Sequence, residues 1–295
     1  MSDVFDPRHC ELGEGALWHP ERQCLFWFDI LVNRLFGRDG DQALQWQFAE
    51  NVFAAGWLSR DELLVASETG LWRLNLTSDV RERVAEFPAE PHLRSNDGRA
   101  DNWIGTMGKR SEQEAGIIWR YYRGEMRAIY PGISIPNAVC FDAGRSLAYF
   151  ADTRRKTTWH VRLDAEGWPV ASPEIFLDLN DAGLSPDGAL IDAQGNFWNA
   201  QWGACRVACY APDGREIAVE HFAASRISCP AFGGKDLDLL FATSAFQGMS
   251  SDARRDEPNA GATFRAWRSR ASFWDNRSPY VVACCIKQGG GLNDR

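Results

Sequence analysis

Short apolar runs alternate with polar turn residues along the chain, and no long stretch repeats apolar residues at helical spacing. The clearest runs occupy residues 24–30, 62–66, 147–151 and 239–243. Pairs that end in glycine stand between such runs, for example Asp39-Gly40, Asp97-Gly98, Asp187-Gly188 and Asp213-Gly214. These pairs favour tight hairpins because glycine tolerates positive φ, so the pattern predicts a mainly β protein with these pairs in turns.

The strand pattern repeats along the chain, and each unit begins at an anchor residue. The anchors are Glu14, Ala55, Asn96, Asn137, Asp187 and Cys229, at spacings of 41, 41, 41, 50 and 42 residues. A period in the 40s with about four strands per unit is typical of a β-propeller blade. Six units predict an all-β, six-bladed β-propeller, and because no linker interrupts the pattern we expect a single domain over residues 1–295.

Closing the ring requires the last blade to join the first. We expect residues before Glu14 and after Phe241 to share one sheet, which would protect the strand edges. The longer interval before Asp187 predicts a loop over one face of the ring.

Composition excludes several function classes. The 295 residues are 45% hydrophobic and 24% charged, with a net charge of −8. This acidic balance lacks the positive footprint of a nucleic-acid-binding protein and opposes binding to anionic membranes. No apolar run approaches the roughly 20 residues that span a bilayer, and the first residues do not resemble a secretory signal. We therefore expect a cytoplasmic monomer or small homo-oligomer with reduced cysteines and small-molecule, cation or protein partners.

Four of the six anchors are polar, which packing alone does not explain. Equivalent anchors of a propeller converge at one mouth of the central channel, so Glu14, Asn96, Asn137 and Asp187 would meet there. Carboxylate and amide oxygens are the ligands that divalent cations such as Ca²⁺, Mg²⁺ or Mn²⁺ prefer. Any one of these residues alone would be read as a turn or capping residue, but four in phase favour a cation site.

The same residues lie in motifs that resemble the gluconolactonase/regucalcin (senescence-marker) family of six-bladed propellers. The matching segments are Leu12–Trp18, Arg94–Arg99, Gly105–Met107, Ile135–Ala138, Tyr149–Asp152, Pro186–Gly188, Gly195–Trp198, Trp202-Gly203 and Ala231–Leu237. The stretches Gly116–Tyr121 and Gly132–Asn137 are similar to the bacterial sugar lactonase branch. The hairpin between Asp101 and Trp103 is shorter than is usual in the family, and residues after about 264 show no match.

The resemblance implies a role for each matching residue. The family's metal ligands fall on Glu14, Asn137 and Asp187, and its substrate-binding Arg and Asn fall on Arg94 and Asn96. The implied cofactor is one divalent cation, with Ca²⁺ preferred and Zn²⁺, Mn²⁺, Mg²⁺ or Fe²⁺ as alternatives. The family's Asp before the glycine of this motif is Asp97.

The implied reaction is hydrolysis of a sugar-acid lactone, such as gluconolactone or arabinonolactone, to the aldonic acid. A cation would act as a Lewis acid and Asp187 as the general base, while Arg94 and Asn96 orient the sugar. Two further residues are weaker candidates near the mouth, namely His92 and Trp202. The alternatives are a non-enzymatic propeller that binds Ca²⁺ or a protein, and an enzyme that acts on non-sugar esters or organophosphates.

Overall fold

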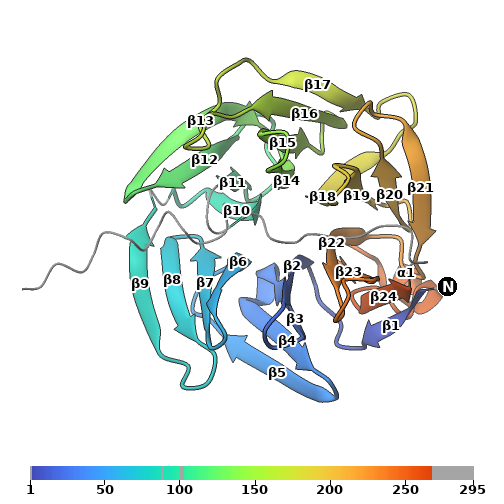
Figure 1. Cartoon of the computed structure of the whole chain (residues 1–295). Helices are drawn as coiled ribbons and strands as arrows, with labels where there is room; N and C mark the ends of the chain where they lie inside the picture. Colours follow the sequence, from blue (N-terminus) through green and yellow to red (C-terminus); the bar gives the residue numbers. More distant parts are fainter. Residues whose placement is uncertain (1, 88–89, 100–102, 268–295) are drawn as a thin grey trace, which may run out of the picture.

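Six four-stranded antiparallel sheets stand around one axis in the computed structural model, which describes residues 2–87, 90–99 and 103–267 (Figure 1). In five sheets the strands follow chain order from the centre outward, so that β2, β6, β10, β14 and β18 lie innermost, and β22 completes the inner ring. This confirms the predicted six-bladed β-propeller. The predicted domain also includes residues 268–295, and the predicted short hairpin includes residues 100–102; both segments lie outside the described residues.

The blades are numbered along the chain. Blade 1 contains β2 (Gly13–His19), β3 (Cys24–Asp29), β4 (Arg34–Asp39) and β5 (Gln42–Gln47), with the 3-10 turn η1 (Ile30–Val32) after β3. Blade 2 contains β6 (Val52–Ser59), β7 (Glu62–Ser67), β8 (Gly70–Asn75) and β9 (Arg81–Glu86). Blade 3 contains β10 (Leu93–Gly98), β11 (Trp103–Gly108), β12 (Gly116–Tyr122) and β13 (Glu125–Ile133).

The second half of the ring follows the same plan. Blade 4 contains β14 (Pro136–Asp142), β15 (Leu147–Asp152), β16 (Thr157–Arg162) and β17 (Glu174–Asp178). Blade 5 contains β18 (Ser185–Ile191), β19 (Phe197–Trp202), β20 (Arg206–Tyr210) and β21 (Glu216–His221). Blade 6 contains β22 (Ile227–Gly233), β23 (Leu239–Ser244), β24 (Thr263–Trp267) and β1 (Ser2–Asp6).

The two ends of the propeller meet in blade 6. Strand β1 pairs antiparallel with β24, so the N-terminal segment supplies the outermost strand of the last blade. This pairing confirms the prediction that residues before Glu14 and after Phe241 share a sheet. Asp6 ties the closing strand to blade 1, because its buried carboxylate forms ion pairs with Arg8 at 2.9 Å and Arg38 at 3.2 Å.

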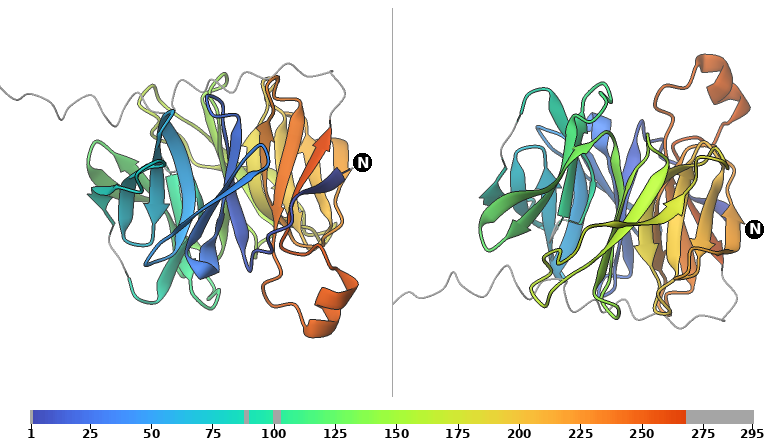
Figure 2. Two further views of the ribbon diagram at one scale, coloured as in Figure 1. Left: turned by 90° about the horizontal axis from the view of Figure 1, so that it is seen from below. Right: turned by 90° about the horizontal axis from the view of Figure 1, so that it is seen from above.

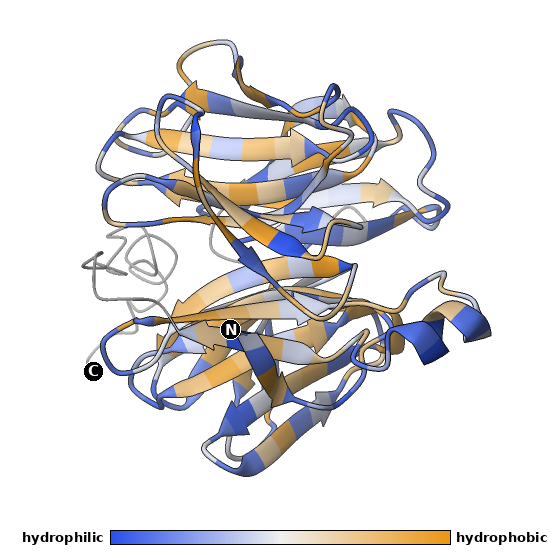
Figure 3. Ribbon diagram, turned by 90° about the vertical axis from the view of Figure 1, so that its right-hand side faces the viewer, coloured by the Kyte–Doolittle hydropathy of each residue, from blue (hydrophilic) through white to orange (hydrophobic). Residues whose placement is uncertain are grey.

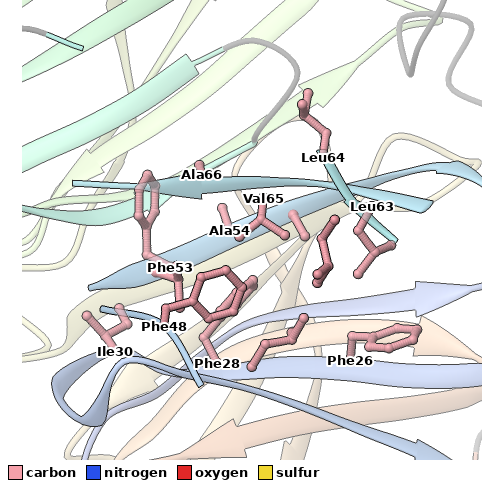
Figure 4. Packing of buried hydrophobic residues seen from close by; sticks show 14 of the residues in the cluster. Phe26, Phe28, Ile30, Phe48, Phe53, Ala54, Leu63, Leu64, Val65 and Ala66 are labelled. Carbon is pink, nitrogen blue, oxygen red and sulfur yellow. The ribbon is translucent and has the colours of Figure 1, made fainter. Parts of the chain in front are cut away.

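The apolar core lies between neighbouring blades. Every residue of β3 is buried, whereas the outermost strand β9 is mostly half-exposed or exposed. Figure 4 shows Phe26 and Phe28 of blade 1 facing residues of blade 2, including Phe53 and Val65. Burial of one such ring is worth roughly 1.5–3 kcal/mol relative to an exposed ring. Figure 3 shows the consequence along the chain, where hydrophobic strand segments alternate with hydrophilic connections.

Two of the predicted turns are wrong. Asp97-Gly98 lies within β10 and Asp187-Gly188 lies within β18, both on innermost strands. In each case the strand pairing shifts register at the pair, which is the signature of a β-bulge. Glycine is needed there for close packing and the bulge, so the same dipeptide that makes a hairpin also occurs inside a strand.

Two connections are longer than the rest. The segment 163–173 between β16 and β17 reaches blade 3, where the Trp168 ring lies 4.0 Å from the guanidinium carbon of Arg120. The segment 245–262 between β23 and β24 carries the short helix α1 (Ser251–Asp256), which projects from one end of the ring (Figure 2). No helix within the described ranges has the length and apolar character that crossing a bilayer requires.

Candidate metal centre and active site

The polar anchors are turned toward the channel by irregularities in the inner strands. Five of the six inner strands shift register immediately around the anchor, between Glu14 and Leu17, Ser95 and Gly98, Asn137 and Cys140, Pro186 and Ala189, and Ile227 and Pro230. A bulge bends its strand and changes the direction of the side chain that it carries. The repeated bulge therefore explains how one position per blade comes to face a common mouth.

Glycines beside two anchors let the inner strands approach each other. Gly15 has φ of +59°, and a Cβ at this position would lie 2.2 Å from the Phe53 carbonyl oxygen of blade 2. A Cβ on Gly188 would lie 2.7 Å from the Ser228 carbonyl oxygen of blade 6. Any larger residue would push the blades apart, so the Glu-Gly and Asp-Gly pairs hold their carboxylates near the axis.

All five predicted site residues are buried at this mouth: Glu14, Arg94, Asn96, Asn137 and Asp187. Burial raises the pKa of Glu14 well above its ordinary value, and the charges of Asp187 and Asp97 raise it further. Burial and the charge of Asp97 likewise raise the pKa of Asp187. Burial lowers the pKa of Arg94, while the charges of Glu14, Glu68 and Asp187 act in the opposite direction. These interactions place Glu14, Arg94 and Asp187 within one electrostatic cluster.

A hydrogen-bond chain links three blades at the mouth. Arg94 Nη1 donates to Asn96 Oδ1 at 2.8 Å, and Asn96 Nδ2 donates to Asn137 Oδ1 at 3.1 Å. Asn137 Nδ2 then donates to Thr153 Oγ1 at 2.8 Å, and Thr153 Oγ1 donates to the Pro186 carbonyl at 2.7 Å. The chain fixes both amides with the oxygen of Asn137 on the Asn96 side.

Thr153 was not identified from the sequence. It follows β15 and lies outside the six anchor positions, so the repeat gives no signal for it. Its hydroxyl connects Asn137 to the residue that precedes Asp187, and it thereby joins two predicted ligands across blades 4 and 5.

Asp97 is a third carboxylate beside the cluster, but its hydrogen bonds give it a structural position. Its Oδ1 accepts from Gly98 N at 2.8 Å, and its Oδ2 accepts from Val139 N at 2.9 Å in blade 4. Arg99 Nη1 lies 3.7 Å from Oδ1. Asp97 therefore fastens two inner strands together, and it also adds negative charge next to Glu14 and Asp187.

The donor set fits a hard divalent cation. Two buried carboxylates that repel each other lose hydration without gaining a partner, which is unfavourable unless a proton or cation neutralises them. Glu14, Asn137 and Asp187 offer oxygen donors, the type that Ca²⁺ prefers. Among the described residues, no cluster of three or more His, Cys, Asp or Glu side chains is arranged to hold a metal. The candidate set is of a different kind, because its third member is an amide.

The two weaker candidates make contacts of other kinds. The His92 side chain is 64% exposed and lies 3.5 Å from Glu90. Trp202 is half-buried and packs against the apolar cluster of blades 1 and 2, with the guanidinium carbon of Arg226 lying 5.5 Å from its ring centre. Trp202 also pairs with Ser185, two residues before Asp187, at the mouth end of β18 and β19.

A pocket of about 190 Å³ is lined in part by Arg94. It is bounded by residues of blades 2 and 3, namely Glu68, Thr69, Glu90, Pro91, Leu93, Arg94, Ser95, Thr106, Lys109 and Trp119. Arg94 therefore both lines this pocket and interacts electrostatically with Glu14 and Asp187.

Comparison with known proteins agrees with this architecture. Residues 12–246 match the SMP-30/Gluconolactonase/LRE-like region. A putative sugar lactone lactonase of Rhizobium meliloti is 37% identical over 86% of this chain and 89% of its own length. An L-arabinolactonase of Azospirillum brasilense is 33% identical over 89% of this chain and 90% of its own.

A solved structure has the same fold. The calcium-binding protein regucalcin from Agrobacterium tumefaciens superposes with a TM-score of 0.87 at 34% identity, covering 90% of this chain and 92% of that one. The family match spans 12–246 of the 295 residues, well over half of the chain. The chain belongs to the SMP-30/gluconolactonase/LRE-like family.

Proposed function

We propose that this protein is a metal-dependent hydrolase that opens a sugar-acid lactone to the aldonic acid. The observation that carries the proposal is the buried pair Glu14 and Asp187, whose charges oppose each other beside the Arg94–Asn96–Asn137 hydrogen-bond chain. Two of the relatives are named as sugar lactone or arabinose lactone hydrolases, which supports the same reaction. Cytoplasmic location and a monomeric or small homo-oligomeric state stay predictions from the sequence.

Glu14, Asn137 and Asp187 would hold the cation, and Ca²⁺ is the preferred ion because a similar structure is that of a calcium-binding protein. Zn²⁺, Mn²⁺, Mg²⁺ and Fe²⁺ are the alternatives. When bound, a divalent cation supplies Lewis acidity for the lactone carbonyl and makes a nearby water more acidic.

The chain's own residues supply proton transfer and orientation. Asp187 accepts a proton from the attacking water as the water oxygen bonds to the carbonyl carbon. The ring C–O bond then breaks, and the proton passes to the departing alkoxide, which leaves an open hydroxy acid. Arg94 donates hydrogen bonds to substrate hydroxyls and Asn96 Oδ1 accepts from them, because Asn96 Nδ2 already donates to the Pro136 carbonyl and to Asn137 Oδ1. The bond between Arg94 and Asn96 holds both side chains in place. Burial of the cluster excludes bulk water and strengthens these interactions.

A lactone panel tests the proposal. Chelator-treated protein is assayed on gluconolactone, arabinonolactone, xylonolactone and galactonolactone, with Ca²⁺, Zn²⁺, Mn²⁺, Mg²⁺ or Fe²⁺ added back and spontaneous opening subtracted. We expect turnover of at least one lactone to depend on an added cation. Cation binding without turnover on any lactone would instead support a non-enzymatic calcium-binding propeller. Turnover of a simple ester assayed in parallel, without turnover of any lactone, would support the ester hydrolase.

A further inference from the structure

Thr153 occupies a position that five blades share. In blades 1, 2, 3, 4 and 6 the residue directly after the second strand donates its N–H to the carbonyl of the residue directly before the innermost strand, at 3.0 Å. This bond belongs to the backbone and does not depend on the side chain. Among the five donors only Thr153 carries a hydroxyl, so its side chain adds a contact that the repeat itself does not require. The donors are Ile30, Glu68, Lys109, Thr153 and Ala245.

The hydroxyl of Thr153 has a single hydrogen, and the structure fixes where that hydrogen points. Thr153 Oγ1 lies 2.7 Å from the Pro186 carbonyl oxygen, which can only accept, so the hydrogen belongs to this bond. Only the lone pairs of Oγ1 are then left for Asn137. The amide atom of Asn137 that lies 2.8 Å from Oγ1 must therefore be the nitrogen, Nδ2.

The other end of the hydrogen-bond chain imposes the same polarity. Asn96 Nδ2 donates to the Pro136 carbonyl, which again can only accept, at 3.0 Å and to Asn137 Oδ1 at 3.1 Å. Asn96 Oδ1 accepts from Arg94 Nη1 at 2.8 Å, and a guanidinium can only donate. Both ends of the chain thus require that Asn137 turns its nitrogen toward Thr153 and its oxygen toward Asn96.

The orientation of the Asn137 amide decides whether this residue can bind a cation. The amide oxygen is a ligand for hard divalent cations, whereas the NH₂ group has only hydrogens to offer. Oδ1 has two lone pairs, and the bond from Asn96 uses one of them, so one remains for a cation. Rotation of the amide by a half turn would exchange this oxygen for the nitrogen.

The turn that carries Thr153 is held by bonds that do not involve its side chain. The buried carboxylate of Asp152 accepts from Ser134 N at 2.8 Å, Ile135 N at 3.2 Å and Arg154 N at 3.1 Å. Together with the bond from Thr153 N to the Ile135 carbonyl, these contacts fasten the turn to the start of β14. A substitution of the Thr153 side chain therefore leaves the turn in place and removes only the hydroxyl.

We propose that Thr153 is a positioning residue, which sets the Asn137 amide so that its oxygen rather than its nitrogen is available to the cation. The inference rests on the proposed metal-dependent function, and Thr153 acts through Asn137 rather than by binding the cation itself. Since its hydroxyl also bonds to the carbonyl of the residue before Asp187, Thr153 links β14 and β18, the strands that carry two of the three proposed ligands.

Calorimetric Ca²⁺ titrations of chelator-treated variants, without lactone, test this role. Thr153→Val keeps the shape of the side chain and removes the hydroxyl, so we expect the affinity for Ca²⁺ to fall about ten-fold or more. Thr153→Ser restores the hydroxyl and should bind Ca²⁺ as wild type does. Thr157→Val is the matched control, because it removes a hydroxyl that donates to the Arg155 carbonyl at 2.9 Å in the same hairpin, and it should leave the affinity unchanged.

A substitution of Asn137 separates positioning from a general structural contribution. Asn137→Asp presents an oxygen in either orientation, so in this background Thr153→Val should weaken Ca²⁺ binding far less than it does in wild type. The proposal is overturned if Thr153→Val binds Ca²⁺ as wild type does, if Thr153→Ser is as weak as Thr153→Val, or if Thr153→Val costs the same factor in both backgrounds.

The same titrations distinguish this proposal from the proposed function. A wild-type protein that binds Ca²⁺ but opens no lactone would remove the hydrolysis, and the assignment of Thr153 would then be decided by the variants alone. A wild-type protein that binds no divalent cation would overturn both.

Discussion

Two aspartates at opposite ends of β18 illustrate two uses of a buried carboxylate. Asp192 follows the strand at the hairpin end and accepts four hydrogen bonds, from Gln194 N, Asn196 N, Asn196 Nδ2 and Trp198 Nε1, at 2.8–2.9 Å. Asp187, at the mouth, is equally buried, and burial together with the charge of Asp97 raises its pKa despite the N–H of Gly188 and the charge of Arg94. The protein therefore stabilises the first carboxylate fully and the second only in part.

The comparison shows that the partners of a buried carboxylate, rather than its burial, distinguish a structural role from a chemical one. A carboxylate surrounded by N–H donors stabilises the fold and has no remaining capacity for a ligand. A carboxylate beside other carboxylates costs stability in the free protein and gains it when a cation binds. We therefore expect substitutions at the two positions to have opposite effects on stability and activity.

Asp187→Asn gives the largest expected effect. The amide cannot accept the proton of the attacking water, so turnover should fall about 10²–10⁴-fold. Thermal unfolding of the cation-free variant should occur at the same or a higher temperature than that of wild type, because one repelling charge is removed. Lactone assays and melting curves on the same preparation check both statements.

A variant that retains full turnover with cation bound would contradict the role of Asp187 as base. A variant that melts well below wild type would show that Asp187 is a structural carboxylate like Asp192.

Asp192→Ala should produce the converse result. Loss of the acceptor leaves buried N–H groups of the hairpin and of Trp198 unsatisfied, so we expect unfolding to become easier by about 2–4 kcal/mol. Turnover per folded molecule should stay at the wild-type level, because the hairpin lies at the far end of β18. Denaturant unfolding measures the first quantity. A loss of turnover in Asp192→Ala without a loss of stability would contradict the distinction between the two ends of β18.

Asp6 allows a test with a smaller expected effect, in which stability is measured as a function of pH. Burial alone would raise its pKa, but hydrogen bonds from Arg8 and Arg38 outweigh burial and hold the pKa below its ordinary value of 3.8. A lowered folded-state pKa contributes stability above the unfolded pKa, and this contribution is lost as the pH falls through the folded value. Asp6→Asn should therefore cost about 1–2 kcal/mol at neutral pH.

The same variant should flatten the loss of stability below about pH 4. Unfolding curves between pH 2 and pH 7 compare the two proteins. Identical acid sensitivity in wild type and Asp6→Asn would mean that the ion pairs of the closing strand do not contribute to the folded state.

Much of the fold could be predicted because it depends on local patterns in the sequence. Strand length, turn residues and the spacing of the anchors are properties of short segments, and they led to six blades and to ring closure through the N-terminal strand. The same local reasoning placed Asp97-Gly98 and Asp187-Gly188 in turns, because a bulge inside a strand uses the residues of a hairpin.

The site was predicted only as far as the repeat and the resemblance extended. They identified Glu14, Asn137 and Asp187 as candidates, but not Thr153, which connects two of them through partners in another blade. Packing across blades brings together residues that have no fixed separation in the sequence.

The central claim is that the opposed carboxylates of the mouth hold one divalent cation, and a calorimetric Ca²⁺ titration of chelator-treated protein tests it most directly. The wild-type protein should bind one Ca²⁺ per chain. Glu14→Gln should bind it about ten-fold or more weakly, because one charged ligand is lost, while Asp192→Ala should bind it as wild type does. Equal affinity in wild type and Glu14→Gln would contradict the account.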